Sequence, residues 1–331
     1  MTSSAALLET AFSPDLPGDP LPPGPRENRW PGEPVEISGT AATAIHRLWR
    51  ARGHHPRPDG TPTTIPRRAV PSAGGSYPVQ WHLVVPPGHG QPLSEGRYVY
   101  HPSDEMLVRR SEPRGPSRLA PDHVEVVLTV QPGRTFGRYR HRAWPLWVAD
   151  AAYALEALLL LVPDAYLPED WSDLAAARRA LGLPRAAQAA WWLERGLVPE
   201  IALARIRVHR DPRLDEVASA AICSRRSPGL DRFQKRRDQI PGTRPGAQAA
   251  RQSGQSWVLG ADRVIGWPRP PRLDATGYAR LWQIHRQAAR HTYSLTARGH
   301  GVRAVSGFCT RPMDTRPLVH AIAILENGAA A

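Results

Sequence analysis

The chain has 331 residues, of which 41% are hydrophobic, so it can bury one large core or two ordinary ones and is expected to be globular. Its formal net charge is +13, and all of its basic residues except Lys235 are arginine. These charges are scattered and accompany no helix-turn-helix, zinc-finger or aromatic RNA-binding pattern, so we expect no nucleic-acid partner. Cys223 and Cys309 lack metal-ligand or CxxC spacing, which indicates no disulfide framework and no metal site and suits a cytoplasmic location.

Neither a signal segment nor a membrane span is expected. The opening "MTSSAALLETAF" has no early basic residue and only a short apolar run. The longest apolar stretch, Leu146 to Val162, is slightly short for a bilayer and carries Asp150 and Glu156, which favours a core helix. The prolines gather in the first 35 residues and around residues 241–272, so both regions are expected to be irregular.

The first part of the chain predicts one α+β unit with a mainly antiparallel sheet. Apolar residues at helical spacing and a glycine stop predict a helix over residues 40–53. Alternation predicts a strand over residues 79–85, followed by the hairpin strands "GRYVYHP" and "EMLVRR" and a longer buried strand at residues 123–132. The apolar helix from about Leu146, a helix ending in Leu-Gly-Leu-Pro and a strand at residues 200–209 complete the unit.

The second part repeats the end of the first in a shorter form. A helix containing "LDEVASAAICSRRS" opens it, and a section with weak signals follows. A helix at residues 278–298, a glycine stop and the strands "VRAVSGF" and "LVHAIAIL" then close the chain. Both parts therefore end as long helix, glycine and strand, which indicates a degenerate duplication. We expect an irregular segment at 1–36, one half at 37–212 and a shortened half at 213–331.

A turn of small residues precedes the strand at 79–85. In "PSAGGSYP" the glycine pair lets the backbone approach a flat or phosphorylated ligand, and Ser72 with the amides of Ala73 to Ser76 can donate hydrogen bonds. From spacing alone the same residues can also be a turn with no ligand.

The stretch "PSAGGSYPVQWHLVV" resembles the flavin turn of the nitroreductase-like family, and specifically its SagB-type branch. "GRYVYHP" looks like the branch's Tyr-x-Tyr-Asp-Pro hairpin, and "RTFGRYRHR" is similar to its Arg-x-x-x-Lys-Tyr-Gly-x-Arg segment. These motifs occur in the family's order and cover about residues 40–210. The resemblance implies an α+β nitroreductase-like fold in which two fused, unequal halves form a pseudo-dimer.

This resemblance implies FMN-dependent dehydrogenation of thiazolines and oxazolines to thiazoles and oxazoles on a ribosomally made peptide. In that reaction a base removes the Cα proton of the ring while hydride leaves Cβ for the flavin. The family's Lys-Tyr pair handles the proton, and here Arg138 and Tyr139 occupy those positions. Arginine stays protonated, so we expect Tyr139 to be the base and Arg138 to lower its pKa or orient the substrate. A solvated basic stretch is the alternative interpretation.

The second part carries the complementary motifs of the flavin site. "ICSRRSPGLDRF" resembles the segment that holds the FMN phosphate, with two extra residues, and "GVRAVSGF" looks like the strand whose last glycine lies beside the flavin ring. A surface basic patch is the alternative for the first motif. The resemblance implies one composite FMN site per chain, built from these residues: Ser72, Ala73, Gly74, Gly75, Arg225, Arg226, Ser227, Ser306 and Gly307.

Departures from the family pattern leave two other functions open. Asp150, Ala151, Ala152 and Tyr153 stand where the family has Asp-Ala-Gly-His, and the insertion after Ser227 changes the phosphate segment. One alternative is a non-catalytic partner that binds a precursor peptide or another maturation enzyme, such as an active dehydrogenase. The other is an NAD(P)H-dependent nitro or enone reductase. For the enzyme itself, the expected partners are a precursor peptide and a cyclodehydratase or other maturation enzymes. Homodimerisation stays open, and the adjacent His54 and His55 make a weak metal site without a nearby acid or cysteine.

Overall fold

A computed structural model describes residues 4–15, 19, 21, 24–57, 59–88, 92–111, 121–209, 212–225, 227–239, 246–272, 274–311 and 314–326. The chain forms two compact units, each built from separate stretches of sequence. Unit 1 comprises Met1–Pro22, Phe136–Tyr153 and Ser224–Ala331, and unit 2 comprises Pro23–Thr135 and Ala154–Cys223. These contact-based units are discontinuous, unlike the expected halves at 37–212 and 213–331, and the division into halves stays a prediction.

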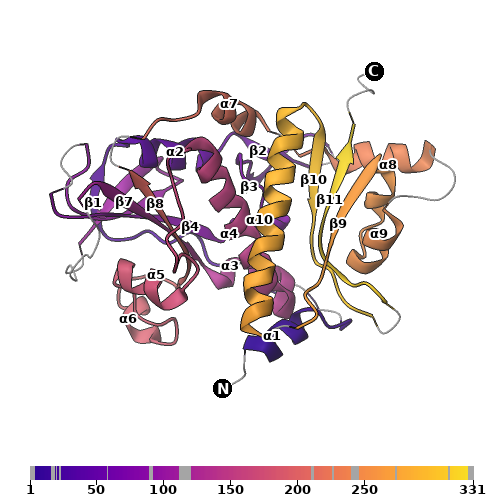
Figure 1. Ribbon diagram of the computed structural model, residues 1–331, viewed down its shortest axis with the longest axis horizontal. Coiled ribbons are helices and arrows are strands. Elements are labelled where there is room, and N and C mark those ends of the chain that lie inside the picture. Colours follow the sequence, from indigo (N-terminus) through magenta and orange to yellow (C-terminus); the bar gives the residue numbers. More distant parts are fainter. Residues whose placement is uncertain are drawn as a thin grey trace. The chain divides into compact units, whose positions relative to one another are not determined.

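Unit 2 is built on a six-stranded sheet in the order β1-β6-β5-β4-β7-β8, with every neighbouring pair antiparallel (Figure 1). Its strands are β1 (Gly32–Val35), β4 (Val79–Val85), β5 (Gly96–His101), β6 (Met106–Arg110), β7 (His123–Val130) and β8 (Ile201–His209). The central strand β4 is buried along its whole length, because its valines and aromatic residues suit a pleated surface covered on both faces. A separate hairpin pairs β2 (His54–Pro56) with β3 (Pro62–Pro66).

Helices cover both faces of the unit 2 sheet. On one face, Trp81 of β4 meets Trp49 of α2 (Thr40–Trp49), with ring centroids 5.7 Å apart. On the other face, Val84 packs in a cluster with Leu181 of α5 (Leu174–Leu181) and Trp192 of α6 (Ala189–Leu193). The alternation of β4 side chains between the two faces therefore decides which helix each of them contacts. The helix α7 (Glu216–Ser224) follows β8 along the chain.

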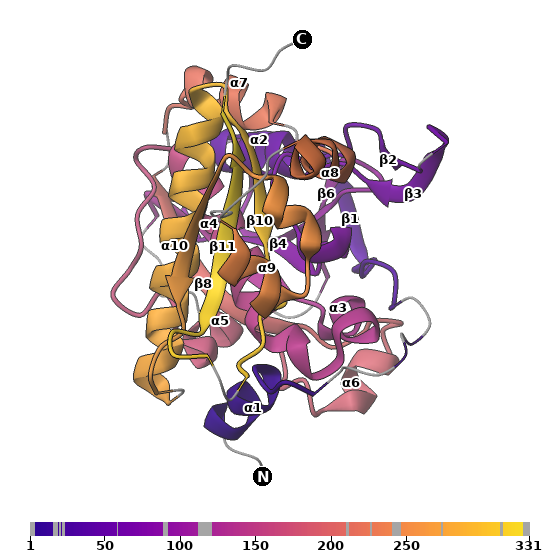
Figure 2. The same ribbon diagram turned by 90° about the vertical axis from the view of Figure 1, so that its right-hand side faces the viewer.

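Unit 1 contains a three-stranded antiparallel sheet in the order β10-β11-β9. Its strands are β9 (Arg263–Pro268), β10 (Gly301–Val305) and β11 (Leu318–Leu325), and its helices include α1 (Ser4–Ala11), α8 (Leu230–Gln239), α9 (Ala247–Ser253) and α10 (Ala275–Ala297). The long helix α10 lies on one face of this sheet and α8 and α9 on the other (Figures 1 and 2). Ala321 and Ala323 of β11 pack with Phe233 of α8, so the alternate residues His320 and Ile322 face α10.

The chain passes between the units inside helices. Residues of α3 (Pro132–Tyr139) and α4 (Ala143–Leu161) belong to both units, and the short 3-10 helix Arg140–Arg142 connects them. This stretch, residues 132–161, is long and apolar enough to cross a membrane, and 78% of its most apolar window is buried inside the protein. A core helix of this composition passes the same test, and α4 is apolar around its whole circumference, as buried helices are.

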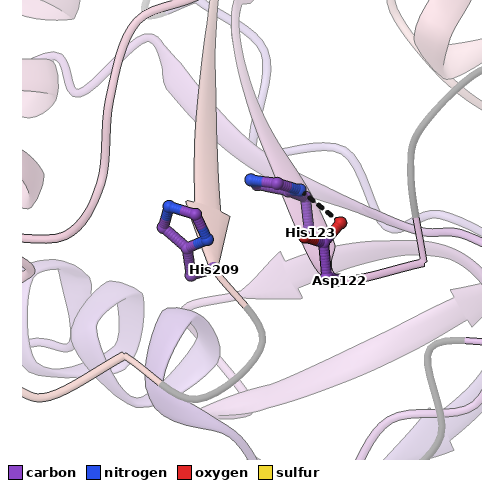
Figure 3. A group of neighbouring side chains, drawn as sticks. All are labelled: Asp122, His123 and His209. Carbon is purple, nitrogen blue, oxygen red and sulfur yellow. Dashed lines mark hydrogen bonds and ion pairs between the residues drawn. The ribbon is translucent and has the colours of Figure 1, made fainter.

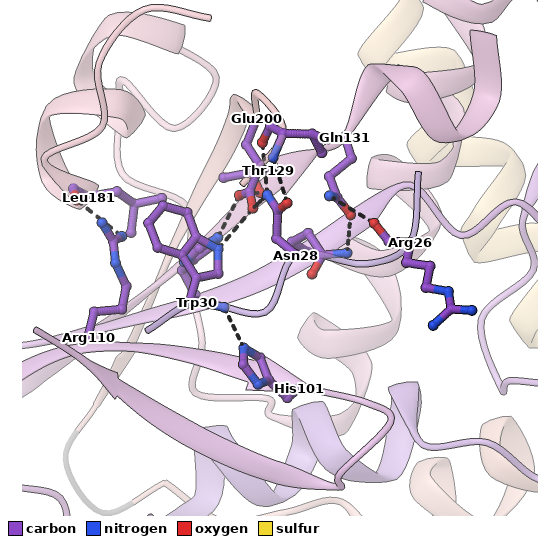
Figure 4. A network of polar contacts seen from close by, with 12 residues as sticks. Arg26, Asn28, Trp30, His101, Arg110, Thr129, Gln131, Leu181 and Glu200 are labelled. Carbon is purple, nitrogen blue, oxygen red and sulfur yellow. Dashed lines mark hydrogen bonds and ion pairs between the residues drawn. The ribbon is translucent and has the colours of Figure 1, made fainter. Parts of the chain in front are cut away.

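A buried network of polar side chains joins the strands of unit 2 (Figure 4). The carboxylate of Glu200 accepts hydrogen bonds from Asn28 Nδ2 at 2.7 Å and from Trp30 Nε1 at 3.0 Å on one oxygen. Its second oxygen accepts from His82 Nε2 at 2.8 Å and from Thr129 Oγ1 at 2.5 Å. Each oxygen thus has two donors, which compensates for taking a charge out of water.

Most elements expected from the sequence are confirmed, and the structure adds others, among them the β2–β3 hairpin, α3, α6 and α8. The expected helices and strands of the first part appear as α2, β4 to β8, α4 and α5, and those of the second part as α7, α10, β10 and β11. The segment 1–36, expected to be irregular, contains α1 and β1. Within residues 246–272, where loops were expected, the structure has α9, a 3-10 helix at Ser256–Gly260 and β9.

Candidate functional site

The small-residue turn before β4 has a defined backbone conformation in unit 2. Gly74 and Gly75 adopt φ values of 58° and 67°, the left-handed region that glycine occupies without strain. A Cβ at Gly75 would lie 2.5 Å from Cγ2 of Ile65, so the close approach of β3 also requires glycine there. Gly74 is exposed, and Ser72 and Ala73 are half-buried.

The amides of this turn are partly used within the turn itself. Gly75 N donates to Ser72 O at 3.1 Å, and Ser76 N donates to Ala73 O at 3.2 Å. Ser72 Oγ accepts from Tyr77 N at 2.9 Å. Two of the amides that the sequence offers as donors to a ligand, those of Gly75 and Ser76, therefore close the turn.

Two of the sequence motifs meet at this turn. Arg134, the first residue of "RTFGRYRHR", donates from Nε to Ser76 O at 3.0 Å and from Nη1 to Pro25 O at 3.1 Å. Ser76 Oγ also lies 3.4 Å from Thr135 Oγ1. Arg134 thus holds the end of the turn, a role that the sequence did not predict.

Tyr139 and Arg138 lie in unit 1 at the end of α3. The guanidinium carbon of Arg138 lies 5.7 Å from the centroid of the Tyr139 ring. Burial is the main cause that raises the pKa of Tyr139. The charge of Arg138 lowers this pKa and the charge of Asp150 raises it, and the net shift is upward. Arg138 lowers the pKa of the phenol as predicted, but burial has the larger effect. The reason is that removing the phenolate from water destabilises it more than the exposed guanidinium stabilises it.

The other basic residues of the same stretch bind backbone. Arg140 Nη2 donates to Asp19 O at 2.6 Å, and Arg142 Nη2 donates to Asp15 O at 2.7 Å. Arg138 is exposed, whereas Arg140 and Arg142 are half-buried.

The predicted phosphate residues form a basic cluster in unit 1. Arg225 is 5% exposed and donates from Nη1 to Ser227 Oγ at 3.0 Å. Burial and the charge of Arg225 lower the pKa of Arg303, whose Nη1 donates to Pro228 O at 2.8 Å. Arg226 lies outside the described residues. Two guanidiniums that repel each other beside a hydroxyl make a donor set that fits a phosphate dianion, so the residues present suit the phosphate of FMN.

Ser306 and Gly307 line a small pocket of unit 1 at the end of β10. Gly307 has φ 81°, and a Cβ built there would meet no atom within 4 Å, so the space beside its backbone is open. The cavity volume is about 10 Å³, room for about one water. Its lining residues are Ala11, Phe12, Arg142, Pro145, Leu146, His285, Ser306, Gly307, Phe308, Val319 and His320.

Two buried histidines in this pocket were missed by the sequence analysis. The rings of His285 and His320 are 4.9 Å apart at 87°, and each residue is 2% exposed. Neither ring nitrogen of His285 has a hydrogen-bond partner within the part of the chain that the structure describes. Burial lowers the pKa of His320 to about 3 and that of His285 well below its ordinary value, so both rings are neutral at pH 7.

A short chain of polar contacts leads from Thr292 to His320. The Tyr153 hydroxyl lies 3.1 Å from Thr292 Oγ1 and 3.0 Å from His320 Nε2. Thr292 Oγ1 also lies 2.9 Å from Ala288 O, which accepts its hydrogen bond. His320 Nδ1 has no hydrogen-bond partner among the described residues.

Tyr153 connects this pocket with the basic cluster of unit 1. Its pKa is raised by burial, with the charge of Arg225 acting in the opposite direction. Tyr153 stands at the position of the family's histidine in Asp-Ala-Gly-His, and the structure makes it a buried hydrogen-bonding residue. No pattern in the sequence signals the pairing of Tyr153 with His320, because 167 positions separate them.

The predicted site residues therefore fall into two groups. Ser72, Ala73, Gly74 and Gly75 belong to unit 2, while Arg138, Tyr139, Arg225, Ser227, Ser306 and Gly307 belong to unit 1. Within unit 1, Ser306 and Gly307 share a pocket, and Arg225 contacts Ser227. That both groups contact one flavin stays a prediction.

The architecture and the arrangement of its strands define a mainly antiparallel α+β protein with the nitroreductase fold. Among solved structures, a protein described as a candidate nitroreductase from Anabaena variabilis matches 98% of this chain and 99% of its own, with a TM-score of 0.65 and 12% sequence identity. This likeness confirms the expected fold. No protein-family model and no curated protein matches the chain.

Two further solved structures overlap with part of the chain. A chain of the E. coli microcin synthetase McbBCD complex with truncated pro-MccB17 bound is 17% identical over 55% of this chain and 68% of that one, with a TM-score of 0.33. A second candidate nitroreductase, from Ralstonia eutropha, is 17% identical over 59% and 94%, with a TM-score of 0.28. Both scores are below 0.5, and we draw nothing from these two matches.

Proposed function

We propose that this protein is an FMN-dependent dehydrogenase that oxidises thiazoline or oxazoline rings to thiazoles or oxazoles on a ribosomally made peptide. The main support is the open backbone at Gly307, next to a pocket with two neutral histidines, in a protein of nitroreductase fold. The flavin and the substrate class in this proposal come from two resemblances in the sequence. The turn at Ser72 to Gly75 resembles the flavin turn of SagB-type dehydrogenases, and the segment at Arg225 to Ser227 resembles the FMN-phosphate segment of nitroreductases. When bound, FMN would supply the hydride acceptor.

In this proposal Arg225, Arg226 and Ser227 bind the phosphate of FMN. Arg225 is buried and already oriented by Ser227, so its guanidinium loses little freedom when it binds an anion. Arg303 adds a second positive charge to the cluster. Gly74 in unit 2 and Gly307 in unit 1 present no side chain, so the backbone at each of these positions leaves room for a flat ring.

Tyr139 is the proposed proton-handling residue. Because burial raises its pKa, the phenol is protonated at neutral pH, and it can act as a base only when the bound ligands lower that pKa. The positive charge of Arg138, beside the Tyr139 ring, would help to lower that pKa. Tyr139→Phe keeps the ring and removes the proton, so we expect the rate of azoline oxidation to fall by about 100-fold or more, while FMN binding is retained. Tyr166→Phe is the matched control, and activity of Tyr139→Phe equal to this control would remove Tyr139 from the mechanism.

The first experiment tests whether the protein binds FMN. The purified full chain should bind FMN and show its yellow absorbance, and Arg225→Leu should weaken this binding by at least about tenfold because one buried guanidinium contact to the phosphate is lost. Arg280→Leu, at an exposed arginine of α10, is the control. A protein that binds no FMN but still binds a precursor peptide would instead be a non-catalytic partner.

The reaction is tested by mass spectrometry. With FMN, oxygen, a precursor peptide and the cyclodehydratase that makes its rings, each oxidised ring should lose two hydrogens, about 2 Da. No mass loss with every partner present would contradict the proposal. Fast reduction of the bound flavin by NADH or NADPH would favour a nitro or enone reductase.

A further inference from the structure

A pair of histidines lies on neighbouring strands of the unit 2 sheet, away from the residues proposed for the flavin. His123 is the first residue of β7 and His209 the last residue of β8, and the two are directly opposite in the antiparallel register. Their ring centroids are 4.4 Å apart. Opposite residues of an antiparallel pair have neighbouring Cβ atoms on the same face of the sheet, so the backbone itself holds these imidazoles together.

A carboxylate completes the group. Asp122 Oδ1 lies 2.7 Å from His123 Nδ1, and one ligand atom from each of Asp122, His123 and His209 lies within 4.8 Å of the others (Figure 3). Donors around a tetrahedral metal are about 3.3 Å apart when the bonds are about 2.0 Å long. Asp122 and His209 are exposed, so small rotations of their side chains can bring the ligand atoms from within 4.8 Å of one another to the spacing that a metal requires.

Tyr166 fixes the ring of His123 from the other side. Its hydroxyl lies 3.1 Å from His123 Nε2, and its ring packs on His123 and His209 with centroids 5.6 and 5.7 Å away. Because the Asp122 carboxylate accepts at 2.7 Å, Nδ1 of His123 carries the ring proton and Nε2 accepts from the Tyr166 hydroxyl. When a cation binds Nδ1 in place of that proton, the ring proton moves to Nε2, which then donates to the Tyr166 hydroxyl as the outer partner that metal-bound histidines usually have.

We propose that Asp122, His123 and His209 bind a divalent transition metal, with Zn²⁺ as the reference ion and water completing the coordination. Two imidazoles and one carboxylate suit Zn²⁺, Ni²⁺ and Cu²⁺ far better than Mg²⁺ or Ca²⁺, which prefer oxygen ligands. The metal ties the start of β7 to the end of β8, which is the edge strand of the sheet. The site is independent of the flavin and of the proposed reaction.

Titration of the full chain, without a polyhistidine tag, with Zn²⁺ at pH 7.5 tests the proposal by calorimetry. We expect one site per chain and a higher thermal unfolding midpoint with Zn²⁺ than with a chelator. His209→Ala should weaken Zn²⁺ binding by at least about tenfold and abolish the midpoint shift. Asp122→Asn should weaken binding while the fold is kept, since its side chain is exposed.

Two controls make the result specific. His54→Ala removes an exposed histidine of β2 and should leave Zn²⁺ binding unchanged. Mg²⁺ should neither bind nor shift the unfolding midpoint. No Zn²⁺ binding by the wild-type chain, or equal Zn²⁺ affinity in wild type, His209→Ala and Asp122→Asn, would overturn the proposal.

Discussion

Glu200 Oε2 and His82 Nε2 lie 2.8 Å apart, and both side chains are completely buried in unit 2. His82 comes from the central strand β4, whereas Glu200 directly precedes β8, so the contact joins segments that are 118 residues apart in sequence. The same carboxylate also bonds Asn28, whose Oδ1 accepts from Val198 N at 2.9 Å. One carboxylate therefore organises several segments of the sheet.

We predict that Glu200→Gln lowers the free energy of unfolding by about 3 kcal/mol, because an amide NH₂ would face buried donors that a carboxylate accepts. Urea denaturation measures the change. Glu194→Gln, at a mostly exposed side chain, is the control and should change stability by less than about 0.5 kcal/mol. Equal stability of Glu200→Gln and this control would mean that the network contributes nothing.

The same residue predicts a pH dependence. Burial alone would raise the pKa of Glu200, but His82 and the hydroxyl and amide donors outweigh it and lower the pKa from 4.5 to about 2. A lowered acid pKa stabilises the fold above the ordinary value, and this contribution is lost as the pH falls from about 4.5 to about 2. The decrease in unfolding free energy over this range should be smaller in Glu200→Gln than in the wild type. Parallel pH profiles would contradict it.

Substitutions of the two buried histidines, His285 and His320, should have opposite effects on the stability of the fold. His285→Leu removes two buried nitrogens that have no hydrogen-bond partner among the described residues, so stability should stay the same or rise by about 1 kcal/mol. His320→Leu removes the hydrogen bond between His320 Nε2 and the buried Tyr153 hydroxyl and should cost about 1 to 3 kcal/mol. If the pocket binds substrate, His285→Leu should still lose activity, which separates function from folding. A clear loss of stability in His285→Leu would show that its ring has a structural partner.

Substitutions at two glycines should separate effects on FMN binding from effects on the stability of the fold. Gly307→Ala introduces a left-handed alanine into open space, so it should cost only about 1 to 2 kcal/mol of backbone strain but weaken FMN binding more than tenfold. Gly75→Ala should destabilise the fold further, because its Cβ would collide with Ile65. Thermal unfolding and FMN titration of both variants measure these effects. Unchanged FMN affinity in Gly307→Ala would remove Gly307 from the flavin site.

Much of the fold and part of the candidate site follow from local pattern. The strand at Val79–Val85 and the helix at Leu174–Leu181 appear where the sequence predicts them, because alternation and helical spacing are local properties. For that helix, Asp173 accepts from two amides of the first turn and Gly182 ends it in the left-handed conformation. The strand β9 was missed, since a glycine and a terminal proline weaken the local strand pattern of this short element, which pairs with β11 in the structure.

The sequence by itself determined the turn before β4 and the long helices and strands of regular pattern, because each depends on neighbouring residues. Only the tertiary structure decided which groups are buried and which of them meet. Burial reversed the expected pKa shift of Tyr139, and folding brought His320 to Tyr153 and His209 to His123 from far along the chain. Desolvation and long-range contact depend on how distant segments pack, which no local pattern encodes.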